Sequence, residues 1–247
     1  MPCKIRPLTY VRGSGMRLRL AMRYLAVGDI HGCFAALTTL AEYVPFKPDD
    51  MLITVGDVVD RGPRSDAVVS WLINYRQRAR HVALRGNHEV MMLSARANND
   101  LLDYWRASGG DATLKSYSEL HDYCRLTDIP DTHWDFIEKE TRPWHEIDTH
   151  FFVHANAYSD CALDEQPDHK LYWEPFDDPP PHINGKIMVC GHTTQASGRP
   201  RNIGHAVCID TAAYDNGWLT CLDVKSGKYW QANERGETRW DWLEEVL

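Results

Sequence analysis

The chain has 247 residues, with 27 Lys and Arg against 35 Asp and Glu, which gives a formal net charge of −8. This length suits one α/β domain with a sizeable core. The acidic balance excludes a protein that binds nucleic acid through a basic surface, and it provides no general attraction to an anionic membrane. Any positive charge used on a phosphorylated ligand must therefore be local, from clustered arginines or bound metal.

The cysteines and the N-terminal stretch bear on the cellular location. Seven cysteines are scattered along the chain without a CxxC pair, which favours buried, reduced thiols in a cytoplasmic protein. Residues 1–22 carry several Arg and Lys but no long apolar run, so we expect a disordered N-terminal extension and no signal peptide. We expect residues 23–247 to form a single domain without a membrane span.

Strand and helix patterns alternate through the first half of the chain. Short apolar runs at residues 24–27, 51–55 and 81–84 predict strands, and each is followed by a turn and an amphipathic helix. This alternation is typical of a mainly parallel sheet with helices on its faces. Residues 98–148 break the rhythm and are helical in character, which predicts a helical insertion beside the sheet.

The second half of the chain returns to strand signals. Residues 151–153 and 187–190 predict two strands, each followed by a turn that contains a histidine. Residues 207–209, 219–222 and 229–231 lie close together with turn residues between them, which predicts an antiparallel second sheet. The pattern as a whole therefore predicts an α/β fold.

Residues with metal-binding or acid–base side chains follow five of the predicted strands directly. In open α/β sheets the loops at the carboxyl ends of the strands form the binding site, so we expect these side chains to meet in one place. They are Asp29 and His31, then Asp57, Asp60 and Arg61, then Arg85, Asn87 and His88, then His154, and finally His192.

Six of these residues offer a mixed set of metal ligands, namely Asp29, His31, Asp57, Asn87, His154 and His192. Mixed oxygen and nitrogen donors suit Mn²⁺, Fe²⁺ or Zn²⁺, of which we favour Mn²⁺, and do not suit Ca²⁺ or a structural zinc ion. Six donors exceed the need of one catalytic ion with open positions, so we expect two divalent ions that share a carboxylate. Two ions about 3.5–4 Å apart can hold a phosphoryl group and generate a bridging hydroxide that attacks phosphorus.

Four further residues suit the handling of phosphate and protons. Arg61 and Arg85 offer planar, bidentate donors to phosphate oxygens. His88 follows the expected ligand Asn87, which places it at the rim of the site as a proton donor to the leaving oxygen. Asp60 is the candidate partner that would orient the His88 ring.

Three motifs, GDIHG (28–32), GDVVDRG (56–62) and RGNHE (85–89), are followed by VHA (153–155) and GHT (191–193). They resemble the signature motifs of the metal-dependent phosphoprotein phosphatase family. The stretch with Trp105, Gly109, Gly110, Ser116 and Tyr117 is most similar to the bacterial and bacteriophage serine/threonine phosphatases. The resemblance implies a calcineurin-like metallophosphoesterase sandwich of two mixed sheets flanked by helices, and a phosphoprotein substrate. It also implies one ion on Asp29, His31 and Asp57, and a second ion on Asp57, Asn87, His154 and His192.

Two alternatives to a protein phosphatase stay open. The bacterial diadenosine tetraphosphatases share much of this pattern, but they usually lack the acid at the Asp60 position and the arginine at the Arg85 position. A non-catalytic phosphoprotein-binding scaffold would keep the fold, although a site that has lost its activity usually loses ligands as well.

Two details of the sequence bear on substrate binding. The stretch 171–175 (LYWEP) has no arginine where larger relatives carry a further phosphate-binding one. Tyr214 precedes an Asp-Asn-Gly turn signal, and it either faces the site or belongs to a plain hairpin turn.

Overall fold

A seven-stranded mixed sheet dominates the computed structural model, which describes residues 22–118 and 125–246. Its strand order is β12-β11-β10-β1-β2-β3-β4. Neighbours from β1 to β4 pair in parallel, as the alternation of strands and helices predicts, whereas β10, β11 and β12 pair antiparallel with their neighbours. The strands are β1 (Tyr24–Val27), β2 (Met51–Thr54), β3 (Arg80–Leu84), β4 (Thr141–Arg142), β10 (Leu219–Asp223), β11 (Lys228–Ala232) and β12 (Thr238–Trp242).

A second, five-stranded mixed sheet has the order β5-β6-β7-β9-β8. Its central strands β6, β7 and β9 pair in parallel, and the two outer strands pair antiparallel. The two mixed sheets, with helices around them, confirm the predicted α/β sandwich. The strands are β5 (Trp144–Glu146), β6 (His150–Val153), β7 (Ile187–Cys190), β8 (Arg201–Asn202) and β9 (Ala206–Cys208).

The prediction that residues 207–209, 219–222 and 229–231 form one antiparallel sheet is wrong. β10 and β11 do form a hairpin, but β10 also pairs with β1, so the hairpin extends the first sheet. β9 pairs in parallel with β7 in the second sheet. Every residue of β10 is buried, which suits a strand between two others and not the edge of a small separate sheet.

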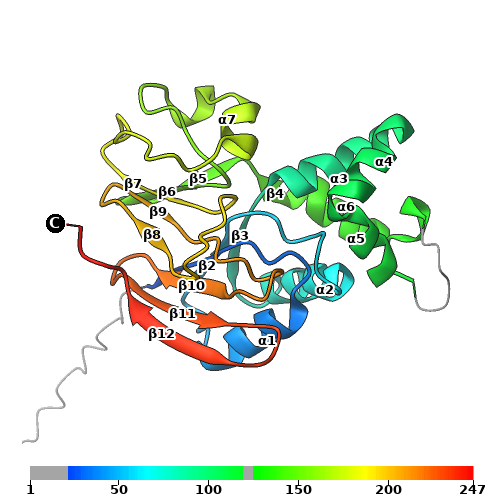
Figure 1. Cartoon of the computed structure of the whole chain (residues 1–247), viewed down its shortest axis with the longest axis horizontal. Helices are drawn as coiled ribbons and strands as arrows, with labels where there is room; N and C mark the ends of the chain where they lie inside the picture. The colour runs from blue at the N-terminus through cyan, green and yellow to red at the C-terminus, as the bar shows by residue number, and fades with distance from the viewer. Residues whose placement is uncertain (1–21, 119–124, 247) are drawn as a thin grey trace, which may run out of the picture.

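Two helices lie against the outer face of the first sheet, a third lies beside the helical segment that follows it, and the two sheets pack against each other (Figure 1). The layer between the sheets is built from apolar side chains such as Ile53 and Leu84 on one side and Phe152 and Val189 on the other. The helices are α1 (Phe34–Tyr43), α2 (Ser65–Arg76) and α3 (Asn87–Ala97). A third cluster lies between the outer face of the second sheet and α7 (Asp168–Trp173), beside the short 3₁₀ turn η5 (Leu163–Glu165).

The segment after α3 is mainly helical and lies at one end of the sandwich, next to α3 (Figure 1). The expected insertion over 98–148 also contains strands β4 and β5, so its last residues belong to the two sheets. Its helices are η1 (Asn99–Leu101), α4 (Leu102–Trp105), the π-helical turn η2 (Arg106–Gly110), α5 (Asp111–Ser116), η3 (Leu126–Asp128), α6 (Asp131–Asp135) and the π-helical turn η4 (Phe136–Glu140).

The remaining expectations about the chain as a whole can be placed briefly. The expected N-terminal extension over 1–22 lies, except for Met22, outside the described residues. Of the cysteines in the described part, four are buried and Cys161 is partly exposed, and all are free thiols. Among the helices of residues 22–118 and 125–246, none has the length and hydrophobicity needed to cross a bilayer.

Candidate active site

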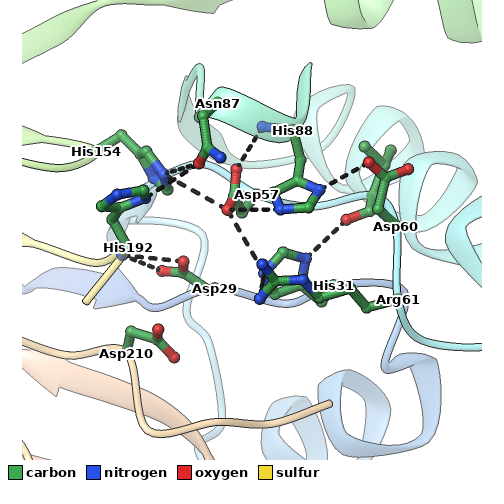
Figure 2. A network of polar contacts seen from close by, with 12 residues as sticks. Asp29, His31, Asp57, Asp60, Arg61, Asn87, His88, His154, His192 and Asp210 are labelled. Carbon is green, nitrogen blue, oxygen red and sulfur yellow. Dashed lines mark hydrogen bonds and ion pairs between the residues drawn. The ribbon is translucent and has the colours of Figure 1, made fainter. Parts of the chain in front are cut away.

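The side chains expected to form the site do gather at the carboxyl ends of strands β1, β2, β3, β6 and β7 (Figure 2). Each of these side chains lies one to seven residues after the end of its strand, so five separate loops meet in one place. The site therefore spans both sheets. The residues that lie together are Asp29, His31, Asp57, Asp60, Arg61, Asn87, His88, His154 and His192.

Asp57 lies at the centre of this cluster. Its Oδ2 atom is 3.5 Å from His31 Nε2, 3.5 Å from His154 Nε2 and 3.9 Å from His88 Nε2. Candidate ligand atoms form two groups that share Asp57, one with His31 and His88 and one with His154 and His192. Burial opposes ionisation of Asp57, but its electrostatic interactions with His154, His88 and His31 and the backbone N–H of His88 lower its pKa below the usual range. One ionised carboxylate thus borders two groups of donors.

The donors around Asn87 fit a cation. His154 Nδ1 lies 2.9 Å from the carbonyl oxygen of Val55 and must donate to it, which leaves a lone pair on Nε2. By the same argument, His192 Nε2 donates to the carbonyl of Trp173 at 3.1 Å and leaves a lone pair on Nδ1. Both lone pairs point at the amide oxygen of Asn87, at 2.9 and 3.1 Å.

With the Asn87 amide oxygen in this orientation, the arrangement is repulsive unless a positive charge lies among the three atoms. Protonation does not supply that charge readily, because burial lowers the pKa of His154 and lowers the pKa of His192 to about 4. A divalent ion on Asp57, Asn87, His154 and His192 would satisfy every lone pair.

The donors around His31 follow the same rule. His31 Nδ1 donates to the carbonyl of Val59 at 2.9 Å, so Nε2 is free to bind an ion and here accepts from Arg61 Nη1 at 3.3 Å. Burial lowers the pKa of His31 to about 3. Asp29 is buried and accepts the backbone N–H of His192 at 3.0 Å, which places its carboxylate beside His192. The group of candidate ligand atoms that contains His31 consists of His31, Asp57 and His88, and Asp29 is not part of it.

His88 and Asp60 form the pair that the sequence suggests. His88 Nδ1 donates to Asp60 Oδ2 at 2.8 Å, and both side chains are buried. This contact turns His88 Nε2 toward the centre of the cluster (Figure 2). Burial works against the charged ring, but Asp57 and Asp60 together raise the pKa of His88. Burial raises the pKa of Asp60, against the hydrogen bond from His88.

The two arginines differ in their placement. Arg61 reaches the cluster, and its guanidinium also stacks over the Tyr214 ring at 4.4 Å. The Tyr214 ring lies edge-on to His31 at 5.0 Å, so this tyrosine faces the site. Arg85 instead donates to Thr141 Oγ1 at 2.9 Å and to a carbonyl oxygen at the end of η4 at 2.7 Å, and neither bond reaches the cluster.

Comparison with known proteins agrees with this geometry. The family profile of the calcineurin-like phosphoesterases matches residues 22–196, well over half of the chain. The chain belongs to the calcineurin-like phosphoesterase family. Membership implies divalent metal ions, and the donors described above are the residues of this phosphoesterase that could hold them.

Individual relatives of the phosphoesterase carry two different activities in their names. The chain is 43% identical over 86 residues to serine/threonine-protein phosphatase 1 of Salmonella typhimurium, and the match covers 34% of this chain and 38% of that protein. It is 40% identical over 82 residues to the symmetrical bis(5′-nucleosyl)-tetraphosphatase of Pseudomonas syringae, and the match covers 33% of this chain and 27% of that protein. The matches thus span well under half of either relative.

Solved structures show the same fold over nearly the whole chain. A serine/threonine phosphatase of Saccharomyces cerevisiae aligns with a TM-score of 0.57 at 17% identity, covering 92% of this chain and 81% of that one. A cold-active protein tyrosine phosphatase aligns with a TM-score of 0.59 at 17% identity, covering 89% and 78%. At these identities the likeness concerns the fold alone.

The backbone of the phosphoesterase is strained where the site residues lie. Left-handed φ angles of 46°, 48°, 70°, 66° and 63° occur at His31, Asp57, Asp60, Arg61 and His192. Residues other than glycine adopt this region at a cost of about 1–3 kcal/mol each, and such residues concentrate at functional sites. A Cβ atom on Gly86 would lie 2.6 Å from the backbone nitrogen of Asp57, so only glycine permits this approach of two loops.

Several residues that support the site are ones to which the sequence assigns no role in it. Glu89 accepts backbone N–H groups of the Asp57 loop, and burial together with Asp57 raises its pKa to about 7. Trp105 and Thr113 donate to the Asp60 carboxylate. The RGNHE motif and the Trp105 stretch contained these residues, but their partners lie 31 to 53 positions away in the chain, so no local signal connects them.

Proposed function

We propose that this phosphoesterase is a protein serine/threonine phosphatase that hydrolyses phosphomonoesters with a poor leaving group. One observation carries the proposal: a buried, paired histidine, His88 on Asp60, lies beside the candidate metal ligands. The alkoxide of serine or threonine is a strong base and leaves phosphorus only if it receives a proton. A general acid therefore matters for this substrate class, and it can contribute about 10²–10⁴-fold in rate.

The residues divide the reaction between them in this proposal. When bound, two divalent ions, with Mn²⁺ our first candidate, would supply the nucleophile from water and neutralise charge on the phosphoryl group. Asp29, His31 and Asp57 would hold one of them, and Asp57, Asn87, His154 and His192 the other. Arg61 donates to phosphate oxygens from beside His31, and Arg85 would do so only if its bond to Thr141 opened. His88 Nε2 gives its proton to the leaving oxygen as the P–O bond breaks, while Nδ1 stays bonded to Asp60.

A dinucleoside polyphosphate hydrolase is the second candidate, and the Pseudomonas syringae relative favours it. A nucleotide phosphate leaves as a much weaker base than an alkoxide, so its departure gains little from a general acid. The presence of Asp60, which holds His88 in place, therefore argues for the phosphomonoester. A phosphoprotein-binding scaffold without activity is the third candidate, against which the complete donor set argues.

A substrate comparison tests the proposal. The protein should be assayed on a phosphoserine or phosphothreonine peptide, p-nitrophenyl phosphate and diadenosine tetraphosphate, each with Mn²⁺, Fe²⁺ and Zn²⁺ and after chelation. We expect chelator-sensitive hydrolysis with kcat/KM highest for the phosphopeptide. Higher kcat/KM for the dinucleotide would overturn the proposal in favour of the second candidate, and no hydrolysis of any ester would favour the scaffold.

The His88→Asn variant tests the role of the acid within that activity. Its kcat on the phosphopeptide should fall by about 10²–10⁴-fold, the range for one general acid, with a smaller loss on p-nitrophenyl phosphate, whose leaving group needs little protonation. Near-normal turnover of the phosphopeptide would contradict the role of His88.

A further inference from the structure

The Asp60 carboxylate is bonded by three donors, two of which come from the helical segment after α3. Its Oδ2 atom accepts from Trp105 Nε1 at 2.9 Å as well as from His88, and its Oδ1 atom accepts from Thr113 Oγ1 at 2.7 Å. All four side chains are buried. Because both oxygens act as acceptors, the geometry suits the ionised carboxylate, which has no proton to donate.

The same segment also holds the backbone of the turn that carries Asp60. Asp60 and Arg61 both have left-handed φ angles, 70° and 66°. The N–H of Asp60 donates to Thr113 Oγ1 at 2.8 Å, and the N–H of Arg61 donates to the carbonyl of Gly109 at 3.1 Å. Gly109 has a φ of 120°, and a Cβ there would lie 2.8 Å from Arg61 Cγ, so the contact requires glycine.

The contacts of Trp105 and Thr113 exceed what core packing requires. A buried tryptophan needs one acceptor for its N–H, and many backbone carbonyls could serve, yet this N–H is directed at the oxygen that also binds His88. The Thr113 hydroxyl donates to the carboxylate of Asp60 and accepts from the N–H of the same residue, so it binds both the side chain and the backbone of Asp60. Losing either donor would let the carboxylate rotate and the His88 ring follow.

We propose that Trp105 and Thr113 are positioning residues for proton donation: they hold the Asp60 carboxylate so that His88 Nε2 is aimed at the leaving oxygen. The helical segment is thereby part of the catalytic apparatus as well as of the fold. This inference rests on the proposed role of His88 as general acid. Both residues are fully buried and neither is a candidate metal ligand, so their effect should appear only in the step that needs a proton.

The test compares two substrates that differ in leaving group, phenyl phosphate and p-nitrophenyl phosphate, in Mn²⁺-loaded Trp105→Phe and Thr113→Val. Trp105→Phe removes one donor to the carboxylate, Thr113→Val removes one donor together with an acceptor of the Asp60 N–H, and both keep most of the side-chain volume. We expect kcat on phenyl phosphate to fall about tenfold, a part of the full contribution of a general acid. On p-nitrophenyl phosphate kcat should fall less than about threefold, and KM should change little for either substrate. The ratio of the two kcat values does not depend on the fraction of active enzyme, so partial misfolding cannot mimic the result.

Two controls complete the experiment. Thr113→Ser keeps the hydroxyl and should restore the kcat ratio of the parent protein. Trp134→Phe alters another buried tryptophan of the same helical segment, one that stacks on Arg96, and should leave the ratio unchanged. In a His88→Asn background, Trp105→Phe should cause no further change of the ratio, because the group on which it acts is gone.

The outcomes separate the role of His88 from the role of Trp105 and Thr113. If His88→Asn itself leaves the ratio unchanged, the proposed role of His88 fails. If His88→Asn changes the ratio but Trp105→Phe and Thr113→Val lower kcat equally on both substrates, the positioning role is overturned while the proposed function stands. The same conclusion follows if Trp105→Phe changes the ratio in the His88→Asn background as much as it does in the parent protein.

Discussion

Glu89 is the acceptor for four buried backbone N–H groups at the loops that carry the central carboxylate. Its Oε2 atom accepts from Asp57 at 2.9 Å and Gly86 at 2.7 Å, and its Oε1 atom accepts from Val58 at 2.8 Å and Val59 at 3.3 Å. The side chain is fully buried. Glu89 therefore determines where the Asp57 loop lies relative to the start of α3.

The substitution Glu89→Gln should destabilise the protein strongly. Whichever way the new amide turns, its NH₂ group faces two of the four N–H groups, which then lose their acceptor. Leaving one buried donor unsatisfied costs about 1–3 kcal/mol, so the loss should reach about 2–6 kcal/mol. The total stability of a domain is only about 5–15 kcal/mol, which makes this a severe change.

Urea unfolding of the chelated protein at pH 8 measures the effect without a contribution from bound metal. With a slope of about 3 kcal/mol per molar urea, the midpoint should fall by roughly 0.7–2 M. Glu42→Gln, on the exposed face of α1, is the matched control and should stay within about 0.5 kcal/mol of the parent protein. A Glu89→Gln midpoint equal to that of the control would refute the reasoning, since the four N–H groups would then not depend on Glu89.

Three further predictions follow from the same contacts. Asp60→Asn should lower kcat on the phosphopeptide by about 10²–10⁴-fold, because the neutral amide lacks the negative charge that stabilises the protonated His88 ring; a loss under tenfold would contradict this. When Mn²⁺ is added to the metal-free protein at 100 times its dissociation constant, it should stabilise the fold by about 2.7 kcal/mol and raise Tm. The same Mn²⁺ concentration should raise the Tm of Asn87→Ala less, and an unchanged Tm of the parent protein would count against the metal site. His81 is partly buried, and this burial lowers its pKa to about 3, whereas the unfolded state takes up a proton below about pH 6.5. The parent protein should therefore lose stability relative to His81→Gln as pH falls, by up to about 2 kcal/mol at pH 5, and parallel stability curves would refute this.

Much of the site could be predicted because its residues follow strands that are recognisable from short apolar runs. Asp57 comes after β2 and Asn87 after β3, and parallel neighbours end at one edge of a sheet, so their meeting follows from local patterns alone. His154 and His192 follow β6 and β7 in the same way. The pairing of His88 with Asp60 was a hypothesis from residue chemistry, and the tertiary structure brings the two side chains together.

Other features could not be predicted because they depend on contacts between segments far apart in the chain. The apolar pattern of residues 219–223 predicts a strand but does not say whether β10 pairs with β1 or with a strand of the second sheet. The guanidinium of Arg85 is a plausible phosphate ligand in the motif, but Thr141, 56 positions away, engages it.

The sequence by itself thus determined the types of element and their order, because burial repeats with the period of the helix or strand, and it supplied the candidate residues for binding metal or phosphate. Only the tertiary structure decided the partner of each strand and the orientation of each site residue. The clearest case is Asp60, whose carboxylate is directed by Trp105 and Thr113 from 45 and 53 positions away. Hydrogen bonds of this kind form between whichever groups the packing of the core brings within 3 Å, and local sequence patterns carry no record of that distance.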